Sequence, residues 1–226
     1  MTPTQTSLID KTPVDVKRGR PYVWVSWLTR LLAGENACVW KAWYKAHYKV
    51  PKDESPEREA FFAEQTIKHD AIQDVREKEL KDAGYTVKRE EQGEFKLRGS
   101  KGDLAGKPDL VGMNATEALI VEVKSGKQRE SDAWQVLIYW FALSLDWLKG
   151  SNLRIRGEVA YKGGVTRKVE ALTPQSHAKI ADLLKLVTGD EEPLRTPGKW
   201  DCEYCDIQSC PDRFQAAEAA DASGVF

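Results

Sequence analysis

The segment ALIVEVK, Ala118 to Lys124, constrains the fold of this chain more than any other. Its branched apolar residues predict a buried strand, yet Glu122 and Lys124 interrupt the apolar run. Side chains alternate between the faces of a strand, so Glu122 and Lys124 are expected on one face with Ile120. Because charges are rarely placed in a core without a purpose, this strand predicts a functional site.

A second carboxylate is expected beside the first. Asp109, in the segment Gly106-Lys107-Pro108-Asp109-Leu110, lies 13 positions before Glu122, and the midpoint falls near Ala115 and Thr116 in a predicted turn. If the flanking strands form a hairpin, both carboxylates lie near the same level of the sheet and can share a cation.

Two carboxylates and a carbonyl oxygen form the hard ligand set that Mg²⁺ prefers, with positions left for water and phosphate. Such a metal polarises a phosphodiester, and Lys124 can orient the attacking water or offset developing charge. The alternative is a surface Glu122–Lys124 pair on an edge strand, with Asp109 in an ordinary turn. That alternative is the better interpretation of any one residue, but the combination favours the site.

The remaining patterns predict an α/β fold in which helices cover a mixed sheet. Residues 1–20 are expected to be a flexible arm, residues 21–213 a single domain and residues 214–226 a tail. Helices are expected over residues 23–32, 38–48, 56–84, 133–148 and 174–187, and strands over residues 85–90, 94–98, 110–111, 118–124, 154–161 and 166–172.

The motif Pro108-Asp109 with Glu122-Val123-Lys124 resembles the signature of the PD-(D/E)XK nuclease superfamily. Gln135 and Tyr139 resemble the Q-x-x-x-Y motif of its RecB-like branch, where both side chains share one helix face and point toward the cleft or the DNA. The resemblance implies a restriction-endonuclease-like core that uses Mg²⁺ or Mn²⁺ to cleave DNA. It implies that Asp109, Glu122 and Lys124 are catalytic and that His69, Asp109, Glu122 and Val123 bind the metal. It also implies that Gln135 and Tyr139 bind the DNA.

His69 lies within the predicted helix 56–84, and RecB-like nucleases place a metal-binding histidine on a helix before the aspartate. The glycine that those nucleases carry four residues earlier is Gln65 here. A histidine with a purely structural role is the competing interpretation. His47 and His177 have no comparable context and are assigned no role.

Three of the four cysteines, Cys202, Cys205 and Cys210, crowd the end of the chain, and Cys38 stands alone near the start. This arrangement resembles that of RecB-like nucleases with a four-cysteine iron–sulfur cluster, which include AddB and the CRISPR-associated exonucleases. The resemblance implies a [4Fe-4S] cluster that joins the amino-terminal helical region to the carboxy-terminal cysteine segment. Four thiolates equally suit zinc, which remains the competing interpretation on spacing alone.

The formal net charge of -1 gives no overall basic footprint, so a nucleic-acid site must be a local patch. Basic residues outnumber acidic ones between Lys96 and Arg129, and a solvated charged loop is the alternative for Lys96 to Lys107. Among the eight tryptophans, Trp24, Trp27, Trp40 and Trp43 could stack on unpaired bases, although most are expected in the core.

Three functions follow as hypotheses. The first is a metal-dependent exonuclease on single-stranded or end-containing DNA, and the second is a DNA-binding or assembly subunit of a repair, recombination or CRISPR-adaptation complex, whose nuclease site is vestigial or depends on a partner. The third is a zinc-stabilised interaction domain, which gives Asp109, Glu122 and Lys124 no role. No apolar stretch reaches the ~18 residues of a transmembrane helix and the first twenty residues lack the apolar segment of a signal peptide, so a cytoplasmic protein without membrane contact is expected.

Overall fold

The computed structural model describes residues 15–51 and 55–214 and confirms the α/β arrangement. Its main sheet has five strands in the order β10-β9-β8-β7-β4, with β8 and β9 parallel and the other neighbours antiparallel. These strands are β4 (Thr86–Arg89), β7 (Leu110–Met113), β8 (Glu117–Lys124), β9 (Arg154–Tyr161) and β10 (Thr166–Val169).

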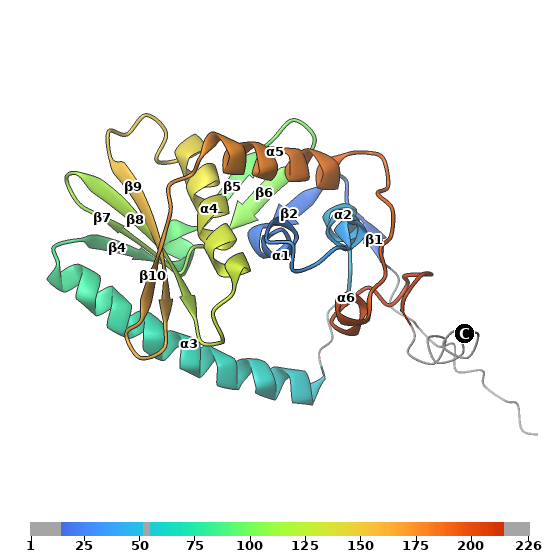
Figure 1. Ribbon diagram of the computed structural model, residues 1–226, viewed down its shortest axis with the longest axis horizontal. Helices are drawn as coiled ribbons and strands as arrows, with labels where there is room; N and C mark the ends of the chain where they lie inside the picture. The colour runs from blue at the N-terminus through green and yellow to red at the C-terminus, as the bar shows by residue number, and fades with distance from the viewer. Residues whose placement is uncertain (1–14, 52–54, 215–226) are drawn as a thin grey trace, which may run out of the picture.

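Two helices cover opposite faces of this sheet (Figure 1). The long helix α3 (Pro56–Asp82) crosses one face, and α4 (Glu130–Leu145) connects the parallel strands β8 and β9 across the other. Pro56 stands in the first turn of α3, as expected, and Gly84 follows its end with a φ of 85°. The functional strand β8 is therefore enclosed between α3 and α4.

The hairpin of β7 and β8 has the register that the sequence predicts. Leu110 pairs with Val121 in antiparallel orientation, which sets Asp109 opposite Glu122 one step further along. Ile120 packs on the α4 side of the sheet, and Leu119, Val121 and Val123 pack on the α3 side. Glu122 and Lys124 thus emerge on the face that α4 covers.

A second sheet corrects one expectation. Residues 23–32 were expected to be a helix, but Tyr22–Trp24 form β2, and only η1 (Val25–Trp27) and α1 (Thr29–Leu32) are helical. β2 pairs in parallel with β6 (Asp103–Gly106), which pairs in turn with β5 (Phe95–Arg98). The short strand β6 was not predicted because its residues, DLAG, carry no strand pattern, and pairing with it overrides the helical pattern of residues 23–24.

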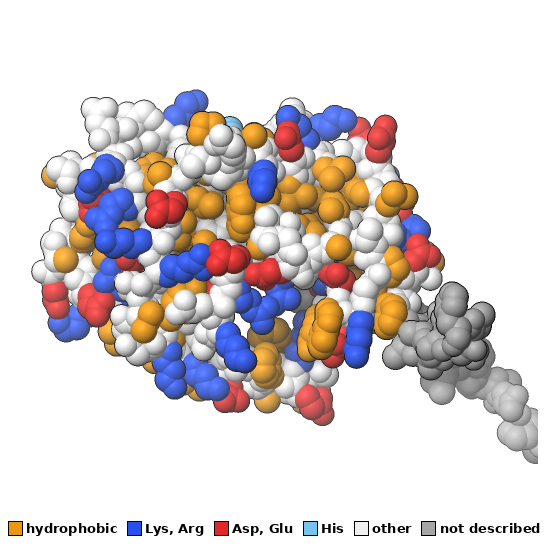
Figure 2. All heavy atoms as spheres, viewed as in Figure 1, with side chains coloured by type: hydrophobic (Ala, Val, Ile, Leu, Met, Phe, Trp, Pro, Cys, Tyr) orange, Lys and Arg blue, Asp and Glu red, His pale blue; other side chains and the backbone are white. Residues whose placement is uncertain are grey.

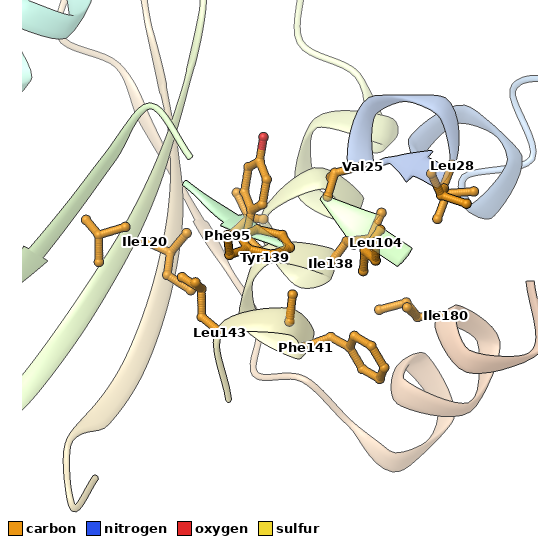
Figure 3. Close-up of a cluster of buried hydrophobic side chains, with 14 of the residues drawn as sticks. Val25, Leu28, Phe95, Leu104, Ile120, Ile138, Tyr139, Phe141, Leu143 and Ile180 are labelled. Atoms are coloured by element: carbon orange, nitrogen blue, oxygen red, sulfur yellow. The ribbon is translucent and has the colours of Figure 1, made fainter. Parts of the chain in front are cut away.

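The largest core lies between the sheets, α4 and α5 (Pro174–Thr188), where buried side chains from all of these elements meet (Figure 3). A smaller core fills the space between α3 and the main sheet. A third surrounds Trp40 and Trp43 of α2 (Val39–His47) and Ile207, and Cys38, Cys205 and Cys210 pack against it.

The ends of the described chain meet near α2. Residues 1–14 of the expected arm and 215–226 of the expected tail lie outside the described residues, whereas Val16–Lys17 form β1 and pair with β3 (Tyr48–Lys49). The last helix, α6 (Lys199–Glu203), lies close to the start of α3 in Figure 1. No helix of residues 15–51 and 55–214 is long and apolar enough to cross a membrane.

Candidate functional site

Asp109 and Glu122 face each other at the end of the β7–β8 hairpin. The Val123 amide donates a hydrogen bond to Asp109 Oδ2 at 2.6 Å, and His69 Nε2 of α3 lies 3.2 Å from the same oxygen. The hydrogen bond between the His69 imidazole and the Asp109 carboxylate raises the pKa of His69. The structure thus brings four of the residues predicted to hold a metal, His69, Asp109, Glu122 and Val123, to one place.

Glu122 is 3% exposed, and only one of its carboxylate oxygens has a partner. Oε1 accepts a hydrogen bond from Lys124 Nζ at 2.6 Å, whereas Oε2 is buried without one. Burial, with the negative charge of Asp109, raises the pKa of Glu122 to about 8. An unpartnered buried carboxylate oxygen is costly, and a cation beside it would remove that cost and favour the charged form.

Lys124 begins a chain of hydrogen bonds that ends at the segment before Asp109. Lys124 Nζ donates to Gln135 Oε1 at 2.9 Å, Gln135 Nε2 to the Tyr139 hydroxyl at 3.0 Å, and that hydroxyl to the Lys107 carbonyl at 3.1 Å. Tyr139 is only 3% exposed, and burial raises its pKa, so the hydroxyl remains a donor. Gln135 and Tyr139 therefore orient the lysine and the segment before Asp109.

Gln73 also belongs to the site, although its role was not predicted from the sequence. It is fully buried, and its Nε2 donates to the backbone carbonyl of Asp109 at 2.8 Å, while its Oε1 has no partner. The same carbonyl accepts the Glu90 amide at 3.1 Å, and Glu90 has a φ of 47°. Gln73 lies four residues after His69 on α3, so the shared helix face was the available signal.

The donor set fits a divalent cation. No three His, Cys, Asp or Glu side chains of the described residues are already arranged as a metal-binding group. The lone oxygen Glu122 Oε2, however, lies beside Asp109 with no hydrogen-bond donor, and carboxylate oxygens with a backbone carbonyl suit Mg²⁺ or Mn²⁺.

The four cysteines, Cys38, Cys202, Cys205 and Cys210, line one small cavity between the start of α2 and residues 199–210, which we call the α6 segment. All four are half-buried free thiols, and burial raises the pKa of Cys205. They converge from positions far apart in the sequence, but no three His, Cys, Asp or Glu side chains within residues 15–51 and 55–214 are arranged to hold a metal ion. Thiolates are the ligands of zinc and of iron–sulfur clusters, so a shared metal site at the cysteines stays a prediction.

The basic segment predicted between Lys96 and Arg129 is partly neutralised within the protein. Lys96 pairs with Asp103 at 3.4 Å, and Lys107 pairs with Glu90 at 3.1 Å and with Glu91 at 2.9 Å. These lysines are therefore less available to DNA than their number in the sequence indicates.

Comparison with known proteins places this geometry in a family. The family model described as the PD-(D/E)XK nuclease superfamily matches residues 28–211. A solved structure titled "Crystal structure of SSO0001" is similar in fold, with a TM-score of 0.53 and 16% sequence identity over 88% of this chain and 89% of that one. No curated protein matches the chain.

Proposed function

The chain belongs to the PD-(D/E)XK nuclease superfamily, which implies a metal-dependent nuclease, and from this premise we propose a Mg²⁺- or Mn²⁺-dependent deoxyribonuclease. We further propose an exonuclease that acts on single-stranded DNA or DNA with free ends. The observation that carries the proposal is the buried, unpartnered Glu122 Oε2 opposite Asp109 and next to Lys124.

Each residue of the site has a role in this proposal. Asp109, Glu122, His69 and the Val123 carbonyl hold the metal, which supplies Lewis-acid polarisation of the scissile phosphate. Lys124, held by Glu122 and Gln135, orients the attacking water and offsets charge that develops on the phosphate. Tyr139 positions this assembly, and direct DNA contact by Gln135 stays a prediction.

The cysteines have a structural role in this proposal. Cys38, Cys202, Cys205 and Cys210 bind a [4Fe-4S] cluster, or zinc in the competing interpretation, and tie the start of α2 to the α6 segment. Joining positions 164 residues apart removes conformational freedom from the unfolded chain. The support is the single cavity that the four thiols line.

The test is incubation of purified protein with end-labelled single- and double-stranded DNA, with Mg²⁺, with Mn²⁺ or with chelator. Metal-dependent release of mononucleotides or short products from the ends supports the exonuclease. Products cut only at internal positions contradict it, and metal-independent DNA binding without cleavage favours a subunit of a repair, recombination or CRISPR-adaptation complex.

A further inference from the structure

A surface that none of the roles above uses lies between α6 and the first turns of α3. It contains two adjoining hollows, which share Arg58, Tyr204 and Asp206. Figure 2 shows lysine and arginine side chains around a hollow in this part of the molecule. We call it the basic-aromatic surface and define it by Lys41, Arg58, Phe61, Phe62, Trp200 and Tyr204.

The aromatic side chains of this surface face solvent. Trp200 is 71% exposed and Tyr204 68%, and Phe61 and Phe62 are also exposed. In contrast, Trp40 and Trp43, which the sequence offered as stacking residues, are buried in the core around Ile207. Four exposed aromatic rings on one surface indicate a binding site, because aromatic rings bury large apolar areas when they find a partner.

The charge of the surface indicates what binds there. The first hollow is lined by four cations, Arg30, Lys41, Lys45 and Arg58, and two carboxylates, Asp201 and Asp206, in a chain whose net charge is -1, and Asp206 pairs with Lys45 at 2.9 Å. The second hollow, beside Phe61 and Phe62, is lined by Arg58 and Arg213 and by the carboxylates Glu57, Glu203 and Asp206, so the excess of positive charge lies in the first hollow. Lys41 Nζ donates to the Tyr204 carbonyl at 2.9 Å, so this hydrogen bond leaves its charge unneutralised. A positive hollow beside exposed rings matches a ligand with phosphates and unstacked bases.

The helix α3 leads from this surface to the nuclease site. Phe62 and His69 are seven residues apart, which places both on one face of α3, roughly 10 Å from each other along the axis. Gln65, on the same face, lies 3.5 Å from the Ser125 hydroxyl, next to Lys124. A strand that leaves the site along this face of α3 therefore reaches the basic-aromatic surface.

We propose that the basic-aromatic surface binds the unpaired strand of a DNA substrate, and that its nearest ring, Phe62, meets this strand about three nucleotides from the scissile phosphate. This inference rests on the proposed nuclease function and adds the place where single strands are selected. Rings stack on bases only where the bases are unpaired, whereas a duplex offers the surface its phosphates alone.

The experiment measures binding of fluorescent oligothymidylates of 4, 8 and 12 nucleotides, and of a 12-base-pair duplex, by anisotropy in chelator, so that cleavage does not contribute. Wild-type affinity is expected to rise with length and to favour the single strand. Trp200→Ala and Tyr204→Ala should each lower affinity for the 12-mer about tenfold and remove most of the gain from length.

Two further variants and two controls keep the test decisive. Phe61→Ala and Phe62→Ala change α3 rather than the α6 segment, and should have the same effect even if Trp200→Ala disturbs that segment. Leu194→Ala and Lys149→Ala, exposed residues outside both hollows, should bind as the wild type does.

Aromatic variants that all match these controls would overturn the inference in favour of a protein partner, and equal losses for single strand and duplex would overturn it as a stacking site. The two proposals fail separately. Wild-type protein that shows the length effect but never cleaves with metal refutes the nuclease, whereas metal-dependent cleavage with unchanged binding by the aromatic variants refutes the surface.

Discussion

The two candidate metal sites of this protein are held by different means. In the sheet, Asp109 and Glu122 are fixed by the β7–β8 ladder, by the Val123 amide and by the bonds from Gln73 and Glu90. At the other end, Cys38, Cys202, Cys205 and Cys210 come from the start of α2, from the short helix α6 and from the residues after it, and they only line a cavity.

The backbone pairing of the sheet therefore holds the ligands of the first site in place without a metal, whereas the ligands of the cysteine site need the metal to hold them together. We call the first site fold-organised for this reason. Removing metal from the sheet leaves the backbone pairing of Asp109 and Glu122 in place. Removing metal from the cysteines leaves the α6 segment held by the packing around Trp40, Trp43 and Ile207 and by bonds at its surface, such as those from Lys41 to the Tyr204 carbonyl and from Lys45 to Asp206. We therefore expect the first site to control activity and the second to control stability.

The largest effect should come from the sheet site. Asp109→Asn and Glu122→Gln should lower metal-dependent cleavage by about 10³-fold or more, because each removes a metal carboxylate. Thermal stability should stay unchanged or rise, since both variants keep the side-chain shape and remove a buried charge. Cleavage rates and melting curves measure this, with exposed Glu170→Ala as the control; unchanged cleavage by both variants contradicts the assignment.

The cysteine site should show the opposite pattern. Cys38→Ser and Cys205→Ser should each lower Tm by about 6–12 °C if the loss of one ligand costs about 3 kcal/mol, and cleavage should survive in part. Iron, acid-labile sulfide and zinc assays on anaerobically purified protein distinguish cluster from zinc. The double variant should lose little more than either single one, because both residues serve one site; fully additive losses would refute a shared site.

A third test addresses the other end of β8. Hydrogen bonds from Tyr85 and Arg154 lower the pKa of buried Glu117 to about 2 from its usual 4.5. A lowered pKa stabilises the fold above pH 5, and this stability is lost as the pH falls from about 5 to 2. Denaturant titrations between about pH 5 and pH 2 measure the free energy of unfolding, which should fall by about 2 kcal/mol more for the wild type than for Glu117→Gln.

Parallel acid profiles for the two proteins would contradict this role of Glu117. The same profiles bear on the comparison of the two regions. Because Glu117 lies in β8, its protonation should destabilise the strand that carries Glu122. Glu117→Gln should leave the metal content of the cysteine site at pH 7 unchanged.

The smallest effect should come from Gln73. Gln73→Met keeps the volume but removes the hydrogen bond to the Asp109 carbonyl, so affinity for Mn²⁺ should fall about tenfold with little change in secondary structure. Calorimetric titration and circular dichroism measure the two quantities. The control is Gln175→Met, an exposed helical glutamine on α5, and equal Mn²⁺ affinity of both variants would show that Gln73 has only a packing role.

The part of the fold that the sequence predicts is the part with strong local patterns. Alternation in ALIVEVK, Pro56 at the first helical position and the stop at Gly84 predict β8 and α3, and the hairpin places Asp109 opposite Glu122. These signals suffice because the faces of a strand and the ends of a helix are decided by neighbouring residues.

The features that were missed depend on residues distant in the sequence. β2 becomes a strand only because β6 lies beside it, and Gln73 is recognised only when its amide is seen at the Asp109 carbonyl. The structure was likewise needed to show that the side chains of Trp200 and Tyr204 are exposed to solvent. Composition cannot separate these rings from the core tryptophans Trp40 and Trp43.

The turn between β7 and β8 has a consequence for how this gene can vary. Asn114 Oδ1 closes the turn by accepting hydrogen bonds from the amides of Thr116 and Glu117. The carboxylates of Asp109 and Glu122 lie opposite each other because Leu110 pairs with Val121. Descendant genes can therefore lengthen this turn and change the spacing of 13 without loss of the site. A one-codon deletion between Ala118 and Val121 would instead turn Glu122 to the opposite face, so reading-frame-preserving deletions there should be purged by selection.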